Sequence, residues 1–212
     1  MNIVHAIIFS IVEGITEFLP ISSTGHMILA STMLQIQETD FVKSFEIIIQ
    51  LGAILAVLLL YWKKLVYSHK TLLRVFIAFI PTAIIGLVLY RFIKTTLLGN
   101  PWVVLSSMAL GGIFLIILEL FHKEKTTHTD TIENISYRHA FLIGIFQSLS
   151  IIPGVSRAAA TIVGALLVGM KRAPSVEFSF LLAIPTMAAA TGLDLLKSGK
   201  YFTGSQYEIL AI

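Results

Sequence analysis

Cysteine is absent from this chain of 212 residues, which excludes disulfides and metal sites built on thiolates. Charged residues are also scarce: Asp, Glu, Lys and Arg make up 13% of the chain, whereas soluble domains carry about 25%. The net charge is only +3, and no run of basic residues is longer than two. This charge pattern does not indicate binding to nucleic acid, and we expect no nucleic-acid partner.

Apolar residues, in contrast, are abundant. They make up 56% of the chain, and the mean hydropathy is +0.88, which is typical of an integral membrane protein. Four stretches are long enough to cross about 30 Å of hydrocarbon, and they lie near 42–62, 75–93, 101–121 and 176–196. We therefore predict an all-α, polytopic membrane protein with about four full transmembrane helices, forming a single membrane domain over 1–212. The N-terminus has no basic region before its apolar run, so we expect the first segment to belong to the mature fold rather than to a signal peptide.

Two further pairs of apolar stretches are shorter. They lie within about 1–36 and 138–170, and Pro20 and Pro153 split them. Because proline removes a backbone donor and breaks helices, each pair indicates a helix, a break and a second helix. One kinked spanning helix is the alternative for each pair, but roughly 35 residues are too many for one crossing. We therefore prefer two re-entrant hairpins whose tips lie at membrane depth.

The two hairpins resemble each other in sequence. FLPISS and IIPGVS both place a serine three residues after the proline, and the helix that follows each hairpin opens with an acidic residue close to phenylalanine (SFEIIIQL and VEFSFLL). Pro20 and Pro153 are 133 positions apart, and Glu46 and Glu177 are 131 positions apart. This near-constant offset indicates an internal repeat.

The number of spans between the hairpins predicts their relative orientation. Three full spans separate them, and an odd number places the second hairpin on the opposite face of the membrane. The two copies are then inverted, and their tips can meet near the midplane, where broken helices build a central site. We expect the inverted repeat to comprise 1–93 and 138–212, with the second copy incomplete at its C-terminal end.

Basic residues predict which side faces the cytoplasm. The richer side would carry Lys63, Lys64, Lys70, Arg74, Lys123, Lys125, Arg138, Lys171 and Arg172. The poorer side would carry Lys43, Arg91, Lys94, Lys197 and Lys200. The positive-inside rule places the richer side in the cytoplasm. The first hairpin then opens to the outside, which is the periplasm in a Gram-negative cell.

A polar segment, EGITEFLPISSTGH, lies in the first hairpin. Glu13 and Glu17 are four residues apart and share one helix face. A charge at mid-bilayer costs at least about 2.5–3.5 kcal/mol, so the pair requires a counter-charge, a proton or a metal such as Mg²⁺ or Ca²⁺. Arg157, at the tip of the other hairpin, is the only basic side chain inside an apolar segment. The alternative is that Glu13 lies near the aqueous mouth and is solvated.

Three hydroxyl residues and a histidine follow in the same segment: Ser22, Ser23, Thr24 and His26. At least one hydroxyl is expected to cap the following helix. A helix N-terminus that carries free amides and further hydroxyls is also an anion site. His26 lies in the first turn, close to any anion bound there, and is a candidate nucleophile or general acid/base. A purely structural histidine is the alternative.

The second hairpin carries PGVSRAAAT, from Pro153 to Thr161. Ser156 can cap the next helix, and Arg157 then lies in its first turn, where the helix dipole disfavours a cation. That position is reasonable if an anion binds there, because a guanidinium binds phosphate through two hydrogen bonds. A structural ion pair between Arg157 and a glutamate is the alternative. A cavity shared by both tips would thus bind a phosphorylated molecule, either to move it or to hydrolyse it, and His26 favours hydrolysis.

These segments resemble the signatures of the undecaprenyl-diphosphate phosphatase family of the bacitracin-resistance type, and the likeness runs over nearly the whole chain. The family's acid-x-x-x-acid motif corresponds to Glu13 and Glu17, and its Ser-Ser-Thr-Gly-His motif to Ser22–His26. Its Pro-Gly-x-Ser-Arg-Ser-x-x-Thr motif corresponds to Pro153–Thr161, with Ala158 in place of the serine after the arginine. Family members usually continue through two further spans. The type-2 phosphatidic acid phosphatases are set aside, because the chain lacks their histidine shortly after Ser-Arg.

The resemblance implies removal of one phosphate from undecaprenyl diphosphate, which recycles the lipid carrier for peptidoglycan synthesis in the bacterial inner membrane. It implies Mg²⁺ or Ca²⁺ at Glu13 and Glu17. The residues expected to act in catalysis are His26, Ser23, Glu17 and Arg157. Those expected to contact substrate phosphates are Arg157, Ser156, Thr24, Ser22 and Thr161.

Several alternatives stay open at this point. The nucleophile is either His26 or Ser23. A polyprenyl-phosphate transporter or flippase is the main competing function, and an inactive scaffold or truncated remnant is a third possibility. The expected partners are the polyprenyl diphosphate lipid and the bilayer, and a homodimer is left open.

Overall fold

The structure is a computed structural model and describes residues 1–37, 39–97 and 100–210. Four long apolar helical segments match the predicted transmembrane helices: Asp40–Tyr67, His69–Phe92, Pro101–Phe121 and Arg172–Tyr201. The shortest has 21 residues, which corresponds to about 32 Å at 1.5 Å per residue. Each segment is therefore long enough to cross a bilayer, and the predicted all-α, multi-pass class is confirmed.

Within these segments the individual helices have the following bounds. The first span consists of α3 (Asp40–Ile48) and α4 (Gln50–Tyr67), and the next three are α5 (His69–Phe92), α6 (Pro101–Phe121) and α9 (Arg172–Ser198). The short elements are η1 (Ile93–Leu97), η2 (Ile132–Asn134), η3 (Leu149–Ile151), η4 (Gly199–Tyr201) and α10 (Gly204–Leu210).

The two proline-split segments form helical hairpins. The first consists of α1 (Ile3–Thr16) and α2 (Ser23–Met33), and the second of α7 (Tyr137–Ser148) and α8 (Arg157–Leu167). These helices have 11 to 14 residues, or about 17–21 Å, so each is too short to cross about 30 Å of hydrocarbon. The predicted order of helix, break and helix is confirmed. Entry into the bilayer as re-entrant hairpins stays a prediction.

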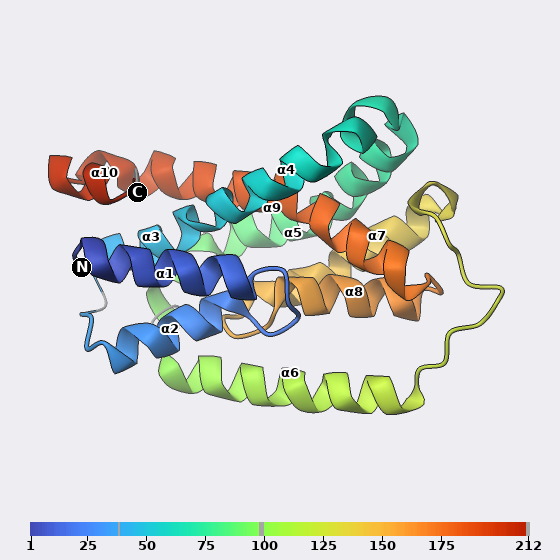
Figure 1. The fold of residues 1–212 in the computed structure, drawn as a ribbon, viewed down its shortest axis with the longest axis horizontal. Coiled ribbons are helices and arrows are strands. Elements are labelled where there is room, and N and C mark those ends of the chain that lie inside the picture. The colour runs from blue at the N-terminus through green and yellow to red at the C-terminus, as the bar shows by residue number, and fades with distance from the viewer. Residues whose placement is uncertain (38, 98–99, 211–212) are drawn as a thin grey trace.

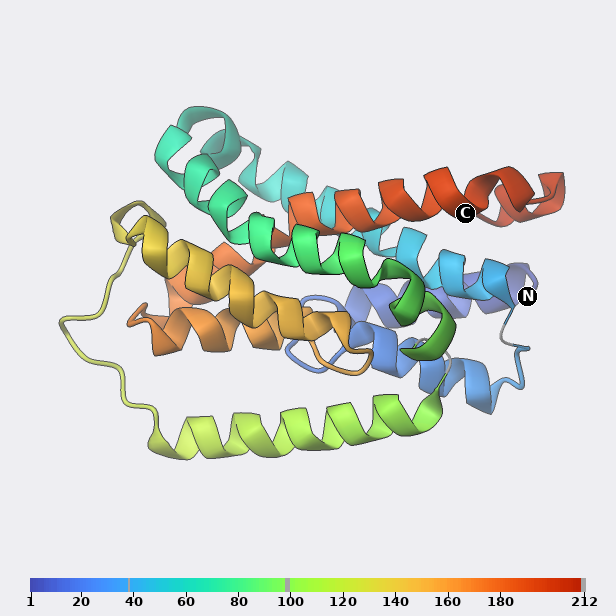
Figure 2. The same cartoon turned by 180° about the vertical axis from the view of Figure 1, so that it is seen from behind.

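The hairpins enter the molecule from opposite ends. In Figure 1 the pair α1 and α2 extends from the end that holds both termini, the pair α7 and α8 extends from the other end, and the two bends meet in the middle. Seen from behind, α5 lies between α7 and α9 (Figure 2). The inverted repeat itself stays a prediction.

Two apolar cores flank the central bends. One lies on the side of the first hairpin, around Phe9, Met27 and Phe45. The other lies on the side of the second hairpin and contains Ile143, Phe178 and other residues of α5, α7 and α9. Each hairpin is therefore anchored by its own core, and a third, smaller cluster on α4 and α9 packs against Phe18 of the first bend.

Close helix contacts hold the second hairpin in place. Gly144 of α7 packs directly on the α5 backbone at Ala78, where a side chain would collide with it. Gly154, in the bend, has φ +92° and lies against the α6 backbone at Val104. Only glycine combines this conformation with such close backbone contact.

The two ends of the molecule differ in basic residues. The α4–α5 turn, the C-terminus of α6 and the N-termini of α7 and α9 lie together at the end opposite the chain termini (Figure 1). These are the segments that carry the richer basic group. The Lys94 side chain of the poorer group lies outside the described part of the structure.

Candidate active site

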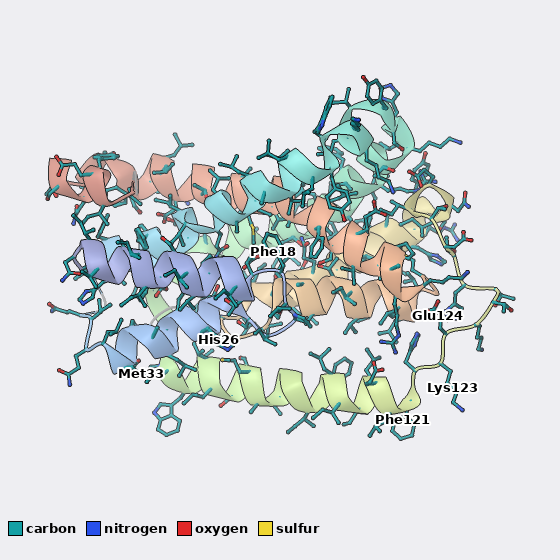
Figure 3. All side chains as sticks on the ribbon, viewed as in Figure 1. Phe18, His26, Met33, Phe121, Lys123 and Glu124 are labelled. Carbon is teal, nitrogen blue, oxygen red and sulfur yellow. The ribbon has the colours of Figure 1, made fainter. Side chains whose placement is uncertain are left out.

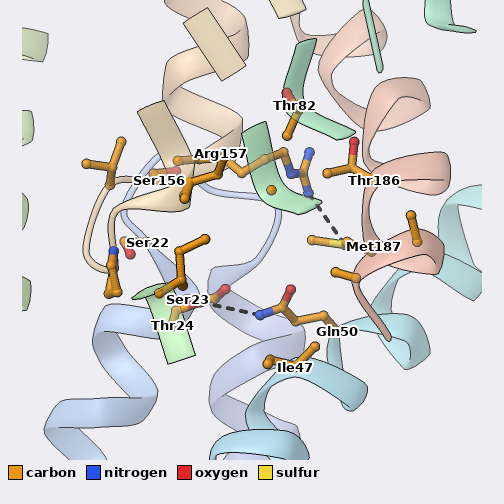
Figure 4. Close-up of a pocket in the computed structure, with 18 of the residues that line it drawn as sticks. Ser22, Ser23, Thr24, Ile47, Gln50, Thr82, Ser156, Arg157, Thr186 and Met187 are labelled. Atoms are coloured by element: carbon orange, nitrogen blue, oxygen red, sulfur yellow. Dashed lines mark hydrogen bonds between the residues drawn. The ribbon is translucent and has the colours of Figure 1, made fainter. Parts of the chain in front are cut away.

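Polar side chains from both hairpin bends line one cavity of about 450 Å³. The first hairpin contributes Glu17, Ser22, Ser23 and Thr24, and the second contributes Ser156 and Arg157. Figure 4 shows these hydroxyl groups and the guanidinium converging on the same space. Residues about 135 positions apart in sequence therefore come together, as the inverted hairpins predict.

The bend of the first hairpin is held by local hydrogen bonds. Ser22 is the N-cap of α2, and its hydroxyl accepts a hydrogen bond from the Gly25 amide (3.2 Å). The capping role expected of one of the three hydroxyl residues thus falls to Ser22. Its φ of +66° lies in the left-handed region, which costs a residue with a side chain on the order of 1–3 kcal/mol. The fold tolerates this conformation where the chain turns into the cavity.

The other two hydroxyls make contacts across the cavity. Ser23 is buried, and its hydroxyl donates to the Glu17 carboxylate. Thr24 is half-buried, and its hydroxyl accepts from the Gln50 side-chain amide at 3.3 Å (Figure 4). Because Glu17 accepts the Ser23 proton, the lone pairs of the Ser23 oxygen stay available to another group.

Arg157 joins the two hairpins through an ion pair. Its Nη2 lies 2.5 Å from Glu17 Oε1, and its Nη1 donates to the Ser179 carbonyl oxygen at 2.9 Å. The side chains are only 10% and 6% exposed for Arg157 and Glu17, respectively. Ser156 caps α8 by accepting from the Ala159 amide (3.1 Å). The predicted counter-charge for the glutamates is therefore Arg157, and its charge lies at the N-terminus of α8, as predicted.

Glu13 lies one helical turn before Glu17 and is 1% exposed. Its carboxylate neighbours the side chains of Glu17 and Ser23, yet neither oxygen has a hydrogen-bond partner among the described residues. Buried carboxylate oxygens without partners fit a hard cation, and Mg²⁺ commonly binds one or two carboxylates together with water and phosphate oxygens. The described residues contain no cluster of three or more His, Cys, Asp or Glu side chains. Water, hydroxyl or substrate oxygens would therefore complete the coordination.

A family model described as "Bacitracin resistance protein BacA" matches residues 6–212, which include both bends and the cavity. The chain belongs to this family. It is 53% identical over 208 residues to an undecaprenyl-diphosphatase of Aquifex aeolicus, covering 98% of this chain and 81% of that protein. An undecaprenyl-diphosphatase of Sulfurihydrogenibium sp. is 51% identical over 212 residues, covering 100% of this chain and 83% of that protein. One of Persephonella marina is 50% identical over 202 residues, covering 95% and 79%, respectively.

Three of the predicted site residues do not line the cavity: Glu13, His26 and Thr161. His26 is half-buried in the first turn of α2 (Figure 3), with its Nδ1 2.8 Å from the Ser22 carbonyl oxygen. Because a carbonyl oxygen only accepts, Nδ1 donates this hydrogen bond. Thr161 is fully buried, and its hydroxyl donates to the Arg157 carbonyl oxygen (2.9 Å). Catalysis by His26 and phosphate contact by Thr161 stay predictions.

Sequence reasoning missed the polar residues on the other cavity walls. They are Glu46 and Gln50 near the α3–α4 junction, Thr82 and Tyr90 on α5, and Thr186 on α9. Glu46 and Gln50 are four residues apart in an otherwise apolar span, and intramembrane polar residues at that spacing were an available signal. The threonines and Tyr90 carried no comparable signal, because these residue types are common in membrane helices.

Proposed function

We propose that this protein removes the terminal phosphate of undecaprenyl diphosphate, giving undecaprenyl phosphate and inorganic phosphate. The observation that carries the proposal is the contact of Arg157 with Glu17 across the two bends, beside the hydroxyls of Ser22, Ser23 and Thr24. A guanidinium and hydroxyls at two helix N-termini suit a diphosphate. The names of the relatives support the same substrate.

The remaining walls of the cavity suit an isoprenoid lipid. Beyond the bends, α5 and α9 line the space mainly with apolar side chains, including Phe79, Leu87 and Leu193. A polar end joined to an apolar wall matches a diphosphate attached to a hydrocarbon chain. The lipid would enter from the bilayer, so substrate and membrane are both partners of this protein.

The geometry supports distinct roles for the hairpin residues. Arg157 would bind the terminal phosphate and stabilise the charge that develops on its oxygens. Ser23 presents an oxygen whose proton already points to Glu17, so Glu17 can accept that proton as Ser23 attacks the terminal phosphorus. The bond from phosphorus to the bridging oxygen then breaks, undecaprenyl phosphate leaves, and water hydrolyses the phosphoserine. His26, through Nε2, is the alternative nucleophile.

Glu13 and Glu17 are the residues that would hold Mg²⁺ or Ca²⁺. A bound divalent cation would neutralise part of the diphosphate charge. The carboxylate oxygens of Glu13, which have no partner among the described side chains and backbone groups, support this assignment.

The test is release of inorganic phosphate from a polyprenyl diphosphate in detergent, with and without EDTA. We expect wild-type turnover that EDTA abolishes and added Mg²⁺ or Ca²⁺ restores. Ser23→Ala should remove turnover, whereas His26→Ala should remove it only if histidine is the nucleophile. Lipid binding without phosphate release by the wild type would instead support a flippase, and full activity after chelation would remove the metal role of Glu13.

We further propose that the protein lies in the bacterial inner membrane with the first hairpin open to the periplasm. The unequal distribution of basic residues between the two ends supports this orientation. Because the chain has no cysteine, single cysteines can report sidedness directly. In intact cells, a membrane-impermeant thiol reagent should label Gln37→Cys and not Thr127→Cys. The reverse pattern would invert the orientation.

A further inference from the structure

Gln147 is a fully buried polar side chain at which four helices meet. It belongs to α7 and does not line the cavity. Its Nε2 donates to the Thr82 hydroxyl on α5 (3.0 Å) and to the Thr186 hydroxyl on α9 (3.1 Å). Its Oε1 lies 3.4 Å from the Thr161 hydroxyl oxygen on α8. One amide therefore contacts three neighbouring helices and is hydrogen-bonded to two of them.

The partners fix the orientation of this amide. The Thr82 hydroxyl donates to the Gly144 carbonyl oxygen (3.2 Å), and the Thr186 hydroxyl donates to the Leu182 carbonyl oxygen (2.7 Å). Each hydroxyl has a single proton, so towards Gln147 each can only accept. The nitrogen of Gln147 must face both threonines, and neither leucine nor glutamate can replace these two donated bonds.

Both threonines follow a proline within a helix. The sequence Ile-Pro-Thr occurs at Ile80–Thr82 and again at Ile184–Thr186, and Pro81 and Pro185 lie inside α5 and α9, respectively. A proline in a helix interior removes one backbone hydrogen bond and favours a kink. The helices α5 and α9 are therefore weakened at the residue just before the threonine that Gln147 contacts.

The same network reaches the residue that binds the anion. The hydroxyl of Thr161 lies within hydrogen-bond reach of Gln147 and also donates to the Arg157 carbonyl oxygen (2.9 Å). Figure 4 shows Thr82 and Thr186 on the same side of the cavity as the Arg157 guanidinium. The side chain that holds both wall helices therefore also contacts α8, one helical turn from Arg157.

We propose that Gln147 is a positioning residue that sets the width of the cavity at the level of Arg157. It does so by holding two proline-weakened helices, α5 and α9, against α7. The inference rests on the proposed phosphatase function, because that width determines how closely a diphosphate is held against the guanidinium. Without Gln147, the halves of α5 and α9 beyond the prolines would move apart, and substrate would bind with its phosphorus poorly aligned.

A distance measurement tests whether Gln147 holds α5 and α9 together, without reference to activity. Val88 on α5 and Leu196 on α9 lie beyond the prolines and are 76% and 82% exposed, so spin labels on cysteines at these sites should be tolerated in the cysteine-free chain. We expect one narrow interspin distance distribution, and a broader or longer one in Gln147→Leu. The matched control is Ser175→Ala, which removes another fully buried polar group whose hydroxyl donates within α9 to the Lys171 carbonyl oxygen. It should leave the distribution unchanged.

Kinetics on the same variants complete the test. We expect Gln147→Leu to lower kcat by about tenfold or more, with little change in KM, as misalignment without lost binding predicts. Thr82→Val should add little to Gln147→Leu, because residues in one network are not additive. If Gln147→Leu does not fold, Thr82→Val and Thr186→Val each remove one of the two bonds donated by Gln147.

Two outcomes would overturn the proposal: an unchanged distance distribution in the folded variant, or lower thermal stability with wild-type kcat. A wild-type protein that releases no phosphate would refute the phosphatase function instead, and the interspin distances would still decide whether Gln147 holds the two helices.

Discussion

Replacing Arg157 by lysine keeps the positive charge between the two hairpins but removes the planar fork. The guanidinium contacts Glu17 at 2.5 Å and the Ser179 carbonyl oxygen at 2.9 Å through different nitrogens. A lysine ammonium is a point donor on a flexible stem and cannot reproduce both contacts while it binds a phosphate. The loss of one hydrogen bond to a charged group corresponds to about 1.5–3 kcal/mol, so kcat/KM for a polyprenyl diphosphate should fall by about 10- to 150-fold.

The assay is steady-state phosphate release in detergent, with thermal unfolding of each variant measured in parallel. Arg172→Lys is the matched control. Arg172 also forms a forked pair, with Glu119 at 2.8 and 3.0 Å, but its side chain is 45% exposed. It is the first residue of α9, and the N-terminus of α9 lies at the end of the molecule opposite the chain termini (Figure 1). Solvent-exposed pairs contribute little, so this variant should match the wild type. Wild-type kinetics from Arg157→Lys would show that the arginine is only structural.

Two further predictions concern stability. Gly154→Ala should lower Tm strongly, because φ is +92° and an added Cβ would lie 2.5 Å from the Val104 carbonyl oxygen. The control is Gly14→Ala, whose added Cβ would meet nothing within 4 Å and should leave Tm nearly unchanged. Equal Tm values for the two variants would refute the close packing of the bend on α6. At the basic end of the molecule, burial raises the pKa of Glu133, but the hydrogen bond from Thr71, the Lys64 charge and the Ser68 hydroxyl outweigh it and lower the pKa overall. A lowered carboxyl pKa stabilises the fold above the unfolded-state pKa, and this contribution is lost as the pH falls through the folded-state pKa. Thermal unfolding of Glu133→Gln should accordingly be less sensitive to acid than that of the wild type, and identical pH profiles would contradict this reasoning.

The spans and the helical hairpins could be predicted from the sequence, because they depend on the length of each apolar stretch and on the positions of prolines. A helix must be long enough to cross the hydrocarbon, and Pro20 and Pro153 mark where the shorter segments break. The odd number of spans between the hairpins predicted that the two bends approach each other from opposite ends. The partner of Glu17 followed from position, because Arg157 is the basic side chain at the tip of the other hairpin.

The cavity walls could not be predicted, because they depend on how each helix is rotated about its axis. Thr82 and Thr186 line the cavity only because α5 and α9 present those faces to the bends. The same limitation applies to Thr161, which has the right spacing from Arg157 to lie in the motif but faces Gln147 instead of the cavity. Spacing along a helix fixes which residues share a face, and only tertiary packing fixes where that face points.

The division of the ion pair between the hairpins links folding to the proposed chemistry. Glu17 lies on the first hairpin and Arg157 on the second, so neither buried charge has its partner until both bends have met. Removing one partner from such a pair costs about 3–5 kcal/mol, since the other charge stays buried without compensation. The cavity therefore forms with the guanidinium already held in place by the carboxylate. A phosphate that binds there competes for a guanidinium that is fixed at 2.9 Å to the Ser179 backbone and does not have to be ordered anew. This preorganisation is what a site needs to stabilise charge in a transition state, and it gives a physical reason for a buried Glu17–Arg157 pair in so apolar a chain.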